Sequence, residues 1–164
     1  MSANFDDLQI LKAAETIADS IWNRVVQWDE FARDVVGKQL ARAADSIGAN
    51  IAEAFGRFNY GEKLQFLYYA RGSLFETKYW LNRTQARGLI QSSEVQEYVD
   101  GLTSLARQLN AFASGLKTVR AEQPKGKPGV VRESTAEYII GNEEISALLF
   151  SEDEIASLGQ LPIT

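Results

Sequence analysis

The segment LARAADSIGANIAEAFGRF, residues 40–58, decides the fold. Its apolar residues return every three or four positions, which is the spacing of a helix face packed against neighbouring helices at a shallow angle. These residues are Leu40, Ala44, Ile47, Ile51, Ala54 and Phe58. A polar stripe with similar spacing lies beside them and consists of Arg42, Ser46, Asn50, Glu53 and Arg57. The segment therefore predicts a helix that buries one face and carries a polar stripe next to it.

The same periodicity recurs in three other segments. Their apolar-face positions are Leu11, Ala14, Ala18, Ile21, Val25 and Trp28, then Leu67, Ala70, Leu74, Thr77 and Leu81, then Val95, Tyr98, Leu102, Leu105, Leu109, Phe112, Leu116 and Val119. We predict helices near residues 6–32, 36–57, 60–87 and 93–120. Because the connections are short, neighbouring helices should run antiparallel, and we expect an all-α, up-down-up-down four-helix bundle.

Capping signals agree with these boundaries. Asn59 with Glu62, and Ser93 with Gln96, have the spacing of capping boxes before the third and fourth helices. Gly88 is placed to end the third helix in a left-handed turn.

The C-terminal part has a different composition. We expect the bundle to occupy residues 1–120, a linker rich in proline and glycine to occupy 121–130, and an acidic extension to occupy 131–164. Ser151 with Glu154 predicts one short helix there, which Gly159 would end. Two interpretations stay open: a solvated or loosely docked appendage, or a linear motif that docks on another subunit or protein. The candidate docking residues are Ile145, Leu148, Leu149 and Phe150.

Composition excludes several kinds of chemistry. The chain of 164 residues contains no cysteine and no histidine, which removes thiol chemistry, His- or Cys-ligated zinc and haem, and the Ser-His-Asp triad. No apolar run approaches the length of about 18 residues that a membrane span needs. The first residues are acidic rather than basic, so we see no secretory signal and expect a cytoplasmic protein.

The net charge of −5 comes from the C-terminal part. Residues 1–120 hold 14 basic and 14 acidic side chains, whereas residues 121–164 hold 3 and 8. Residues 38–87 are mildly positive, with eight basic and four acidic side chains, which fits either a mixed solvated surface or a weak anion-facing patch. The candidate nucleic-acid-facing residues are Arg71, Lys78, Arg83 and Arg87.

The second and third predicted helices have small and aromatic residues outside their core faces. A helix that is apolar on more than one side is normally covered, and an aromatic stripe on an outer face favours association. We therefore predict a homo-oligomer built through these two helices. The candidate subunit-interface residues are Gly48, Ala52, Gly56, Tyr68, Phe75 and Tyr79.

The polar stripe has a structural interpretation and two chemical rivals. Joined by Ser73 and Glu76 of the third helix, it could form a hydrogen-bond network between helices that fixes their register. A di-iron site at Glu53 and Glu76 would need histidines that the chain lacks, and a two-carboxylate glycosidase site has no supporting feature. We favour the network, and expect no catalytic residue, no cofactor and no metal site.

These residues also carry a family resemblance. The segments QLARAADSIGANIAEAFGR and FLYYARGSLFE, with a later GLI, resemble the four-helix bundle family that includes the 23S rRNA intervening-sequence proteins. The matching positions are Gln39, Arg42, Ser46, Ile47, Asn50 to Glu53, Gly56, Arg57, Phe66, Leu67, Gly72, Ser73 and Glu76, while Ala54 stands where the family has glycine. The resemblance covers residues 8–120, and the acidic extension lies outside it.

The resemblance implies a function by binding. Members of this family form ring-like pentamers with no established enzymatic activity, and their fold is similar to the accessory variability determinant of diversity-generating retroelements, a pentamer that binds nucleic acid and a reverse transcriptase. Our leading hypothesis is therefore a non-enzymatic homo-oligomeric scaffold that associates with RNA or a nucleic-acid-processing protein. The alternative is a protein–protein adaptor whose acidic tail recruits or regulates a partner, and an enzyme that uses carboxylates alone is the third hypothesis.

Overall fold

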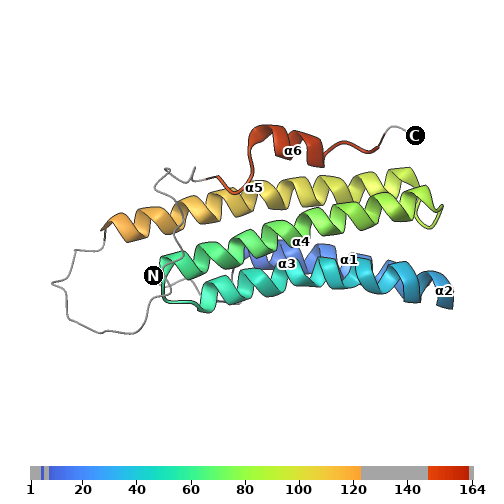
Figure 1. Ribbon diagram of the computed structural model, residues 1–164, viewed down its shortest axis with the longest axis horizontal. Helices are drawn as coiled ribbons and strands as arrows, with labels where there is room; N and C mark the ends of the chain where they lie inside the picture. Colours follow the sequence, from blue (N-terminus) through green and yellow to red (C-terminus); the bar gives the residue numbers. More distant parts are fainter. Residues whose placement is uncertain (1–4, 6–7, 123–147, 163–164) are drawn as a thin grey trace.

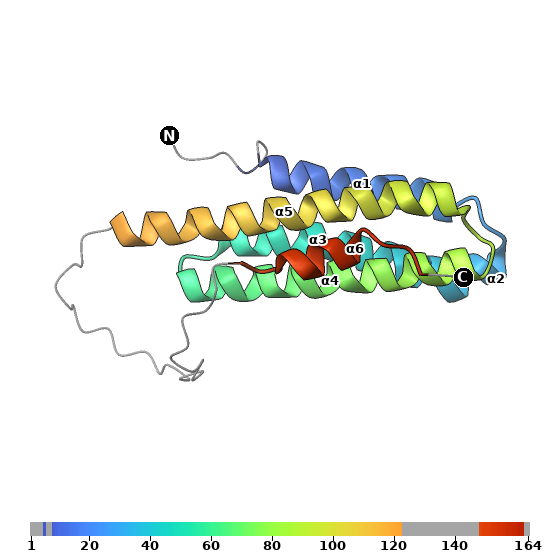
Figure 2. The same cartoon turned by 90° about the horizontal axis from the view of Figure 1, so that it is seen from above.

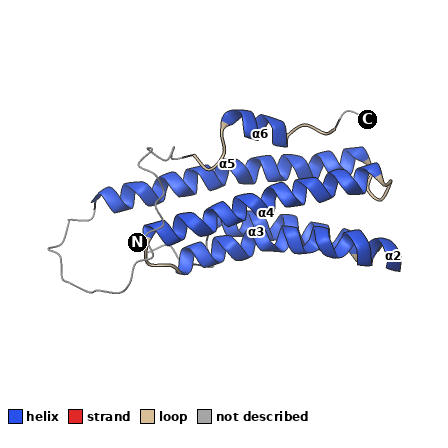
Figure 3. Cartoon of the chain, in the orientation of Figure 1, coloured by secondary structure: helices blue, strands red, loops and turns tan. Residues whose placement is uncertain are grey.

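The computed structural model describes residues 5, 8–122 and 148–162, and within them the secondary structure is helical without strands (Figure 3). The elements are α1 (Gln9–Val25), α2 (Glu30–Ala32), the π-helical segment η2 (Arg33–Gly37), α3 (Lys38–Gly56), α4 (Tyr60–Ala86), α5 (Ser92–Glu122) and α6 (Glu152–Leu158). None of the helices in these ranges is both long and apolar enough to cross a membrane.

The long helices form a bundle. Helix α3 packs between α1 and α4, and α5 contacts both α4 and α1 (Figures 1 and 2). Most of the predicted apolar-face residues are buried in the core, because burial of one face is what holds amphipathic helices together. Tyr98, Phe112 and Leu116 are only partly buried. The core also contains residues outside the predicted positions. Its largest fully buried side chains from these helices are Ile21, Leu40, Ile47, Ile51, Leu67, Leu74, Leu81, Leu102, Leu105 and Leu109. Phe58 is an exception and is 99% exposed, since α3 ends before it.

The first predicted boundary is wrong. Helix α1 ends at Val25 rather than near residue 32, and a new helical stretch begins at α2 and continues through η2 into α3. Asp29 starts it, because its side chain accepts a hydrogen bond from the backbone N–H of Ala32 (3.0 Å). The turn therefore lies at residues 26–29, and the predicted connection at 33–35 is helical. Within this stretch Gly37 lies against α1: a Cβ there would be 2.6 Å from Cγ1 of Val25.

The other boundaries follow the capping signals in part. Gly88 has a φ of +68° and ends the third long helix in the left-handed conformation, as predicted. Asn59 occupies the N-cap position of α4 but makes no side-chain capping bond. Ser93 lies inside α5, which begins one residue earlier, so the capping box predicted there is wrong.

The C-terminal segment, residues 148–162, lies along the outside of the bundle. Helix α6 runs beside α5 and α4 in both views (Figures 1 and 2). The predicted capping box is confirmed: the Ser151 side chain accepts from the Glu154 backbone N–H, and the Glu154 carboxylate accepts from the Ser151 N–H. Gly159 follows the last residue of the helix, also as predicted. Ile145 lies outside the described residues. So does the predicted linker, residues 121–130, except for its first two residues, which belong to α5.

Candidate binding surfaces

The polar stripe and its partners on α4 lie on the outer side of the α3–α4 pair. We call this surface the motif face, and its residues, half-buried or exposed, are Arg42, Ser46, Asn50, Glu53, Arg57, Ser73 and Glu76. Its hydroxyl and amide groups bond to the carbonyl one turn earlier in their own helix, as such groups commonly do. Ser46 donates to the carbonyl of Arg42 (2.8 Å), Asn50 to that of Ser46 (2.8 Å) and Ser73 to that of Tyr69 (3.1 Å).

The charged groups of the motif face also pair locally. Arg57 forms an ion pair with Glu53 one turn earlier, and Arg42 donates to the side chain of Gln39 (2.7 Å). Between the two helices, the guanidinium of Arg57 lies over the ring of Phe66 on α4, 4.7 Å from its centre. Among the described residues, no hydrogen bond joins the motif residues of α3 to those of α4. In the single chain, the predicted inter-helix hydrogen-bond network is therefore absent.

The candidate interface residues separate into two groups. Gly48 faces α1 of its own chain, where a Cβ would lie 3.8 Å from Ala14 and from Leu11, and Ala52 lines the same open hollow of about 250 Å³. At Gly56, as at Gly72 of α4, a Cβ would have no heavy atom within 4 Å apart from the adjacent residues and the backbone of its own helix.

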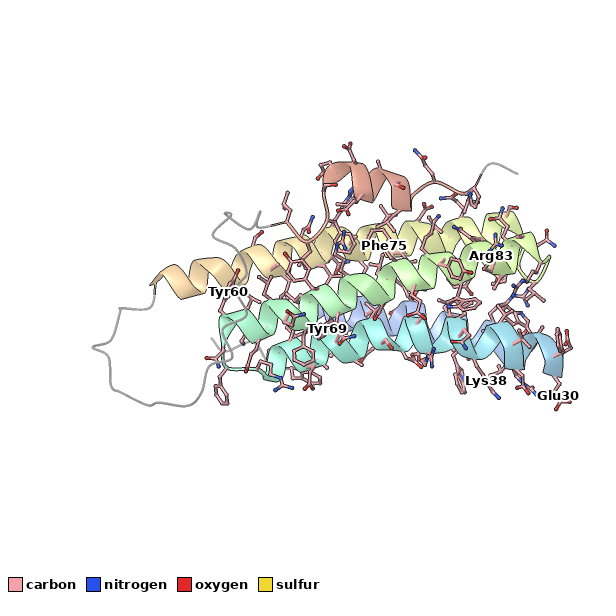
Figure 4. All side chains as sticks on the ribbon, in the orientation of Figure 1. Glu30, Lys38, Tyr60, Tyr69, Phe75 and Arg83 are labelled. Atoms are coloured by element: carbon pink, nitrogen blue, oxygen red, sulfur yellow. The ribbon has the colours of Figure 1, made fainter. Side chains whose placement is uncertain are left out.

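The aromatic candidates separate in the same way. Tyr68 is 36% exposed and Tyr79 is 55% exposed, so both remain open in the single chain. Phe75 is half-buried under the C-terminal segment, where its ring centre lies 5.7 Å from that of Phe150 (Figure 4). Phe75 is thus covered within the chain, and the open aromatic stripe on α4 is shorter than the sequence predicted.

A second surface is the groove that the C-terminal segment fills. We call it the tail groove, and its lining residues are Arg71, Phe75 and Lys78 of α4 with Gln96 and Asn110 of α5. Four apolar side chains of the segment are buried against the bundle: Leu149, Phe150, Ile155 and Leu158. Leu148 stays 47% exposed. Of the candidate docking residues, Leu149 and Phe150 therefore dock on their own chain.

Asn110 holds the backbone of the segment. Its amide nitrogen donates to the carbonyl of Phe150 (2.8 Å), and its amide oxygen accepts from the N–H of Phe150 (2.9 Å). Both residues are buried, so this single side chain supplies partners for two backbone groups that water cannot reach. Such paired bonds fix the register of the segment along α5.

Arg71 binds the segment through three kinds of contact. Its Nε donates to the carbonyl of Leu149 (2.7 Å), and its terminal nitrogen pairs with the carboxylate of Glu154. The guanidinium also lies over the rings of Phe75 and Phe150, at 4.9 and 5.4 Å from their centres. The pKa of Glu154 is below its ordinary value, first because the Ser151 N–H donates to the carboxylate and further because Arg71 is beside it.

The far end of the segment is held in the same way. Lys78 donates to the carbonyl of Gln160, and Gln96 donates to that of Gly159 (3.2 Å). Burial lowers the pKa of Lys78, because the charged form loses water there. Two of the four candidate nucleic-acid-facing residues, Arg71 and Lys78, are thus engaged by the C-terminal segment. Arg83 and Arg87 make no side-chain ion pair or hydrogen bond within the described ranges.

Asn110 and Gln96 were not among the docking residues predicted from the sequence. Together with Thr103 they place a polar side chain at every seventh position of α5, beside a second buried row formed by Val99, Ala106 and Ala113. This row widens the buried face of α5 beyond the predicted heptad positions. The apolar face of α5 is wider than contact with α1 and α4 requires. This extra width was the signal in the sequence that another segment covers α5.

The carboxylates do not gather into a metal centre. In the part of the chain that the structure describes, no group of three or more Asp or Glu residues lies close enough together to hold a metal ion. Glu53, one of the two glutamates considered above as di-iron ligands, forms an ion pair with Arg57.

Comparison with known proteins yields one family. The model of the 23S rRNA-intervening sequence proteins matches residues 6–111. A search of curated proteins found no significant match. The matched range contains the whole motif face and all five lining residues of the tail groove, whereas the C-terminal segment lies beyond it.

Proposed function

The chain belongs to the 23S rRNA-intervening sequence protein family, and on that premise we propose that it acts by binding, as a homo-oligomeric helical bundle without enzymatic activity. The bundle has the up-down-up-down, antiparallel four-helix topology in this proposal. Short connections support this topology: residues 57–59 join α3 to α4, and residues 87–91 join α4 to α5. Connections of this length favour antiparallel packing of consecutive helices.

The observation that carries the assembly is the open surface around Gly72. A glycine inside a helix costs about 1 kcal/mol relative to alanine, and nothing in the single chain comes near the position of its missing Cβ. Tyr69 and Tyr79 of the same helix are also more than half exposed (Figure 4 labels Tyr69). A second backbone packed closely on α4 would explain both features. We place the subunit interface there, next to the motif face, and propose the pentamer that the family resemblance implies.

RNA is the partner that we propose for the assembly, directly or through a nucleic-acid-processing protein. The family is named after 23S rRNA, and two cations at the end of α4, Arg83 and Arg87, are free to meet phosphate. One chain presents a weak patch, but a ring repeats it in every subunit, and contacts with phosphates add in their effect on affinity.

The test measures binding to structured RNA at two salt concentrations. We expect affinity that falls with salt and is lost when both Arg83→Ala and Arg87→Ala are introduced. Arg107→Ala is the matched control, because it removes an exposed cation from α5 instead. Binding that is equally weakened by the control, or is absent at low salt, would reject this surface as the RNA site.

A protein–protein adaptor is the second candidate function. Helix α6 presents Glu152 and Asp153 to solvent while its other side is docked, so its acidic surface is held in a fixed position on the bundle. A basic partner that binds this surface should be retained by the unaltered chain and lost from a Glu152→Lys, Asp153→Lys chain. Retention by both chains would reject the adaptor function of α6.

A further inference from the structure

We propose that the tail groove accepts the C-terminal segment of a second copy of the chain, so that subunits exchange their tails. The proposal rests on the homo-oligomer proposed above and adds a second contact between its subunits. The partner is specific: residues 148–162 of another copy, seated as the chain's own segment is seated here.

The first support is that docking is complete within the segment itself. The hydrogen bonds and the ion pair that join the segment to the bundle run from residues 149–160 to α4 or α5, and the four buried apolar side chains belong to the same range. On the side of the tail, the docking contacts therefore come from the segment alone. A segment from another copy offers the same Phe150, Glu154 and backbone groups to the groove.

The second support is the number of residues between α5 and the segment. Phe150 binds at Asn110, which precedes the end of α5 at Glu122 by twelve residues, or about 18 Å along the helix. Roughly six extended residues would cover that distance. The chain has 25, residues 123–147, with a maximum reach of about 80–90 Å. That exceeds the length of α5, which is about 46 Å for its 31 residues. A connection of 25 residues is therefore long enough to place the segment in the groove of a neighbouring bundle.

The third support is that the groove suits a peptide better than a nucleic acid. Asn110 and Gln96 pair with backbone groups of a polypeptide. Phe150 is fully buried, and its ring lies against Phe75. A nucleic acid in this place would leave the apolar floor without an apolar partner. Arg71 adds selectivity for a carboxylate four residues after the aromatic anchor, where Glu154 stands.

Crosslinking of two full-length variants tests the exchange, because the natural chain has no cysteine. One variant carries Ser157→Cys in the segment, and the other carries Asn82→Cys in α4. These residues line the same hollow of about 440 Å³ when the segment is docked. Each chain has a single thiol, so a short bis-maleimide can join position 157 to position 82 only when a tail docks on another copy. We expect a covalent pair containing one chain of each kind when the variants are mixed.

Three controls make the result decisive. Adding Phe150→Ala to the Ser157→Cys chain should reduce the mixed pair at least about ten-fold, since it removes the buried anchor of the segment. Ile155→Asp is a second way to prevent docking, because it places a charge at another buried position of the segment. Asp19→Cys, an exposed position of α1, replaces Asn82→Cys to measure crosslinks from assembly or collision alone.

The outcomes separate this proposal from the proposed function. A mixed pair no more abundant than in the Asp19→Cys control overturns tail exchange, even if the solution mass shows an oligomer. A monomeric mass with the same result removes both. If the pair stays at that background while the Phe150→Ala chain gains salt-sensitive binding of single-stranded RNA, the groove is a nucleic-acid site covered by the tail, and exchange is again overturned.

Discussion

Replacing Asn110 with alanine should release the C-terminal segment and leave the bundle folded. The amide of Asn110 makes two hydrogen bonds with the backbone of Phe150, which is 0% exposed. Without it, one buried N–H and one buried carbonyl lose their partners while they remain away from water. Each unpaired group costs about 1–3 kcal/mol, so docking should weaken by about 2–6 kcal/mol.

The same substitution should not harm the bundle. Asn110 lies inside α5 on the side that faces the segment, and alanine is the better helix former by up to about 0.7 kcal/mol. The thermal midpoint of the helical signal should therefore stay the same or rise. A loss of docking without a loss of bundle stability distinguishes a docking residue from a core residue.

Hydrogen exchange measured by mass spectrometry separates the two effects. Amides of α6 should exchange at least about 25-fold faster in the Asn110→Ala chain, or at the rate of an unprotected peptide if docking is lost completely. Asn50→Ala is the matched control, because that amide bonds to a carbonyl of its own helix, far from the segment in the sequence. Unchanged exchange in α6 of the Asn110→Ala chain would refute the assignment of Asn110 as the residue that holds the segment.

Three further predictions concern glycines and pH. Gly72→Ala should raise the free energy of unfolding of the dilute chain by about 1 kcal/mol and weaken assembly, whereas Gly115→Ala, which is also open on its helix, should only stabilise the chain. Chemical denaturation measures the stability and light scattering measures the assembly. Unimpaired assembly of the Gly72→Ala chain would contradict the interface on α4. Gly37→Ala should lower the free energy of unfolding by about 1–3 kcal/mol, because the added Cβ would meet Val25 at 2.6 Å; an unchanged denaturation midpoint would show that the contact relaxes freely. The pKa of Glu154 is lowered first by the capping hydrogen bond from the Ser151 N–H and further by Arg71. The contribution of Glu154 is therefore present above the ordinary value of 4.5 and is lost as pH falls through the lowered pKa, so protection of α6 should drop in acid. An identical acid profile in the Glu154→Gln chain would assign the loss to another group.

Much of the bundle could be predicted from the sequence, because its information is periodic. Most of the residues that the a/d spacing placed in the core are buried, and Gly88 and Ser151 marked two boundaries correctly. The first turn was misplaced because apolar periodicity continues through Trp28, which is buried although it lies after the end of α1. Asp29, a capping residue, marked the true start of the next helix. A capping side chain does not break the apolar periodicity, so the periodicity alone does not reveal that helix start.

The candidate surfaces were less predictable, because they depend on which elements meet. Spacing placed the motif residues on one stripe, but it could not show that Ser46 and Asn50 bond within their own helix. Charge alone grouped Arg71 with Arg83, although Arg71 binds residues almost 80 positions later in the chain. The docking partner of the apolar C-terminal cluster required the tertiary structure, since no local pattern reports a contact of that sequence separation.

The mass of the protein in solution shows directly whether the chain assembles into a homo-oligomer. Analytical ultracentrifugation of the full chain over a wide range of concentrations should give a species of several chains of 18.2 kDa each, and five is the number that we propose. A single chain at every concentration would contradict the account, because the open glycine and tyrosines of α4 would then have no partner.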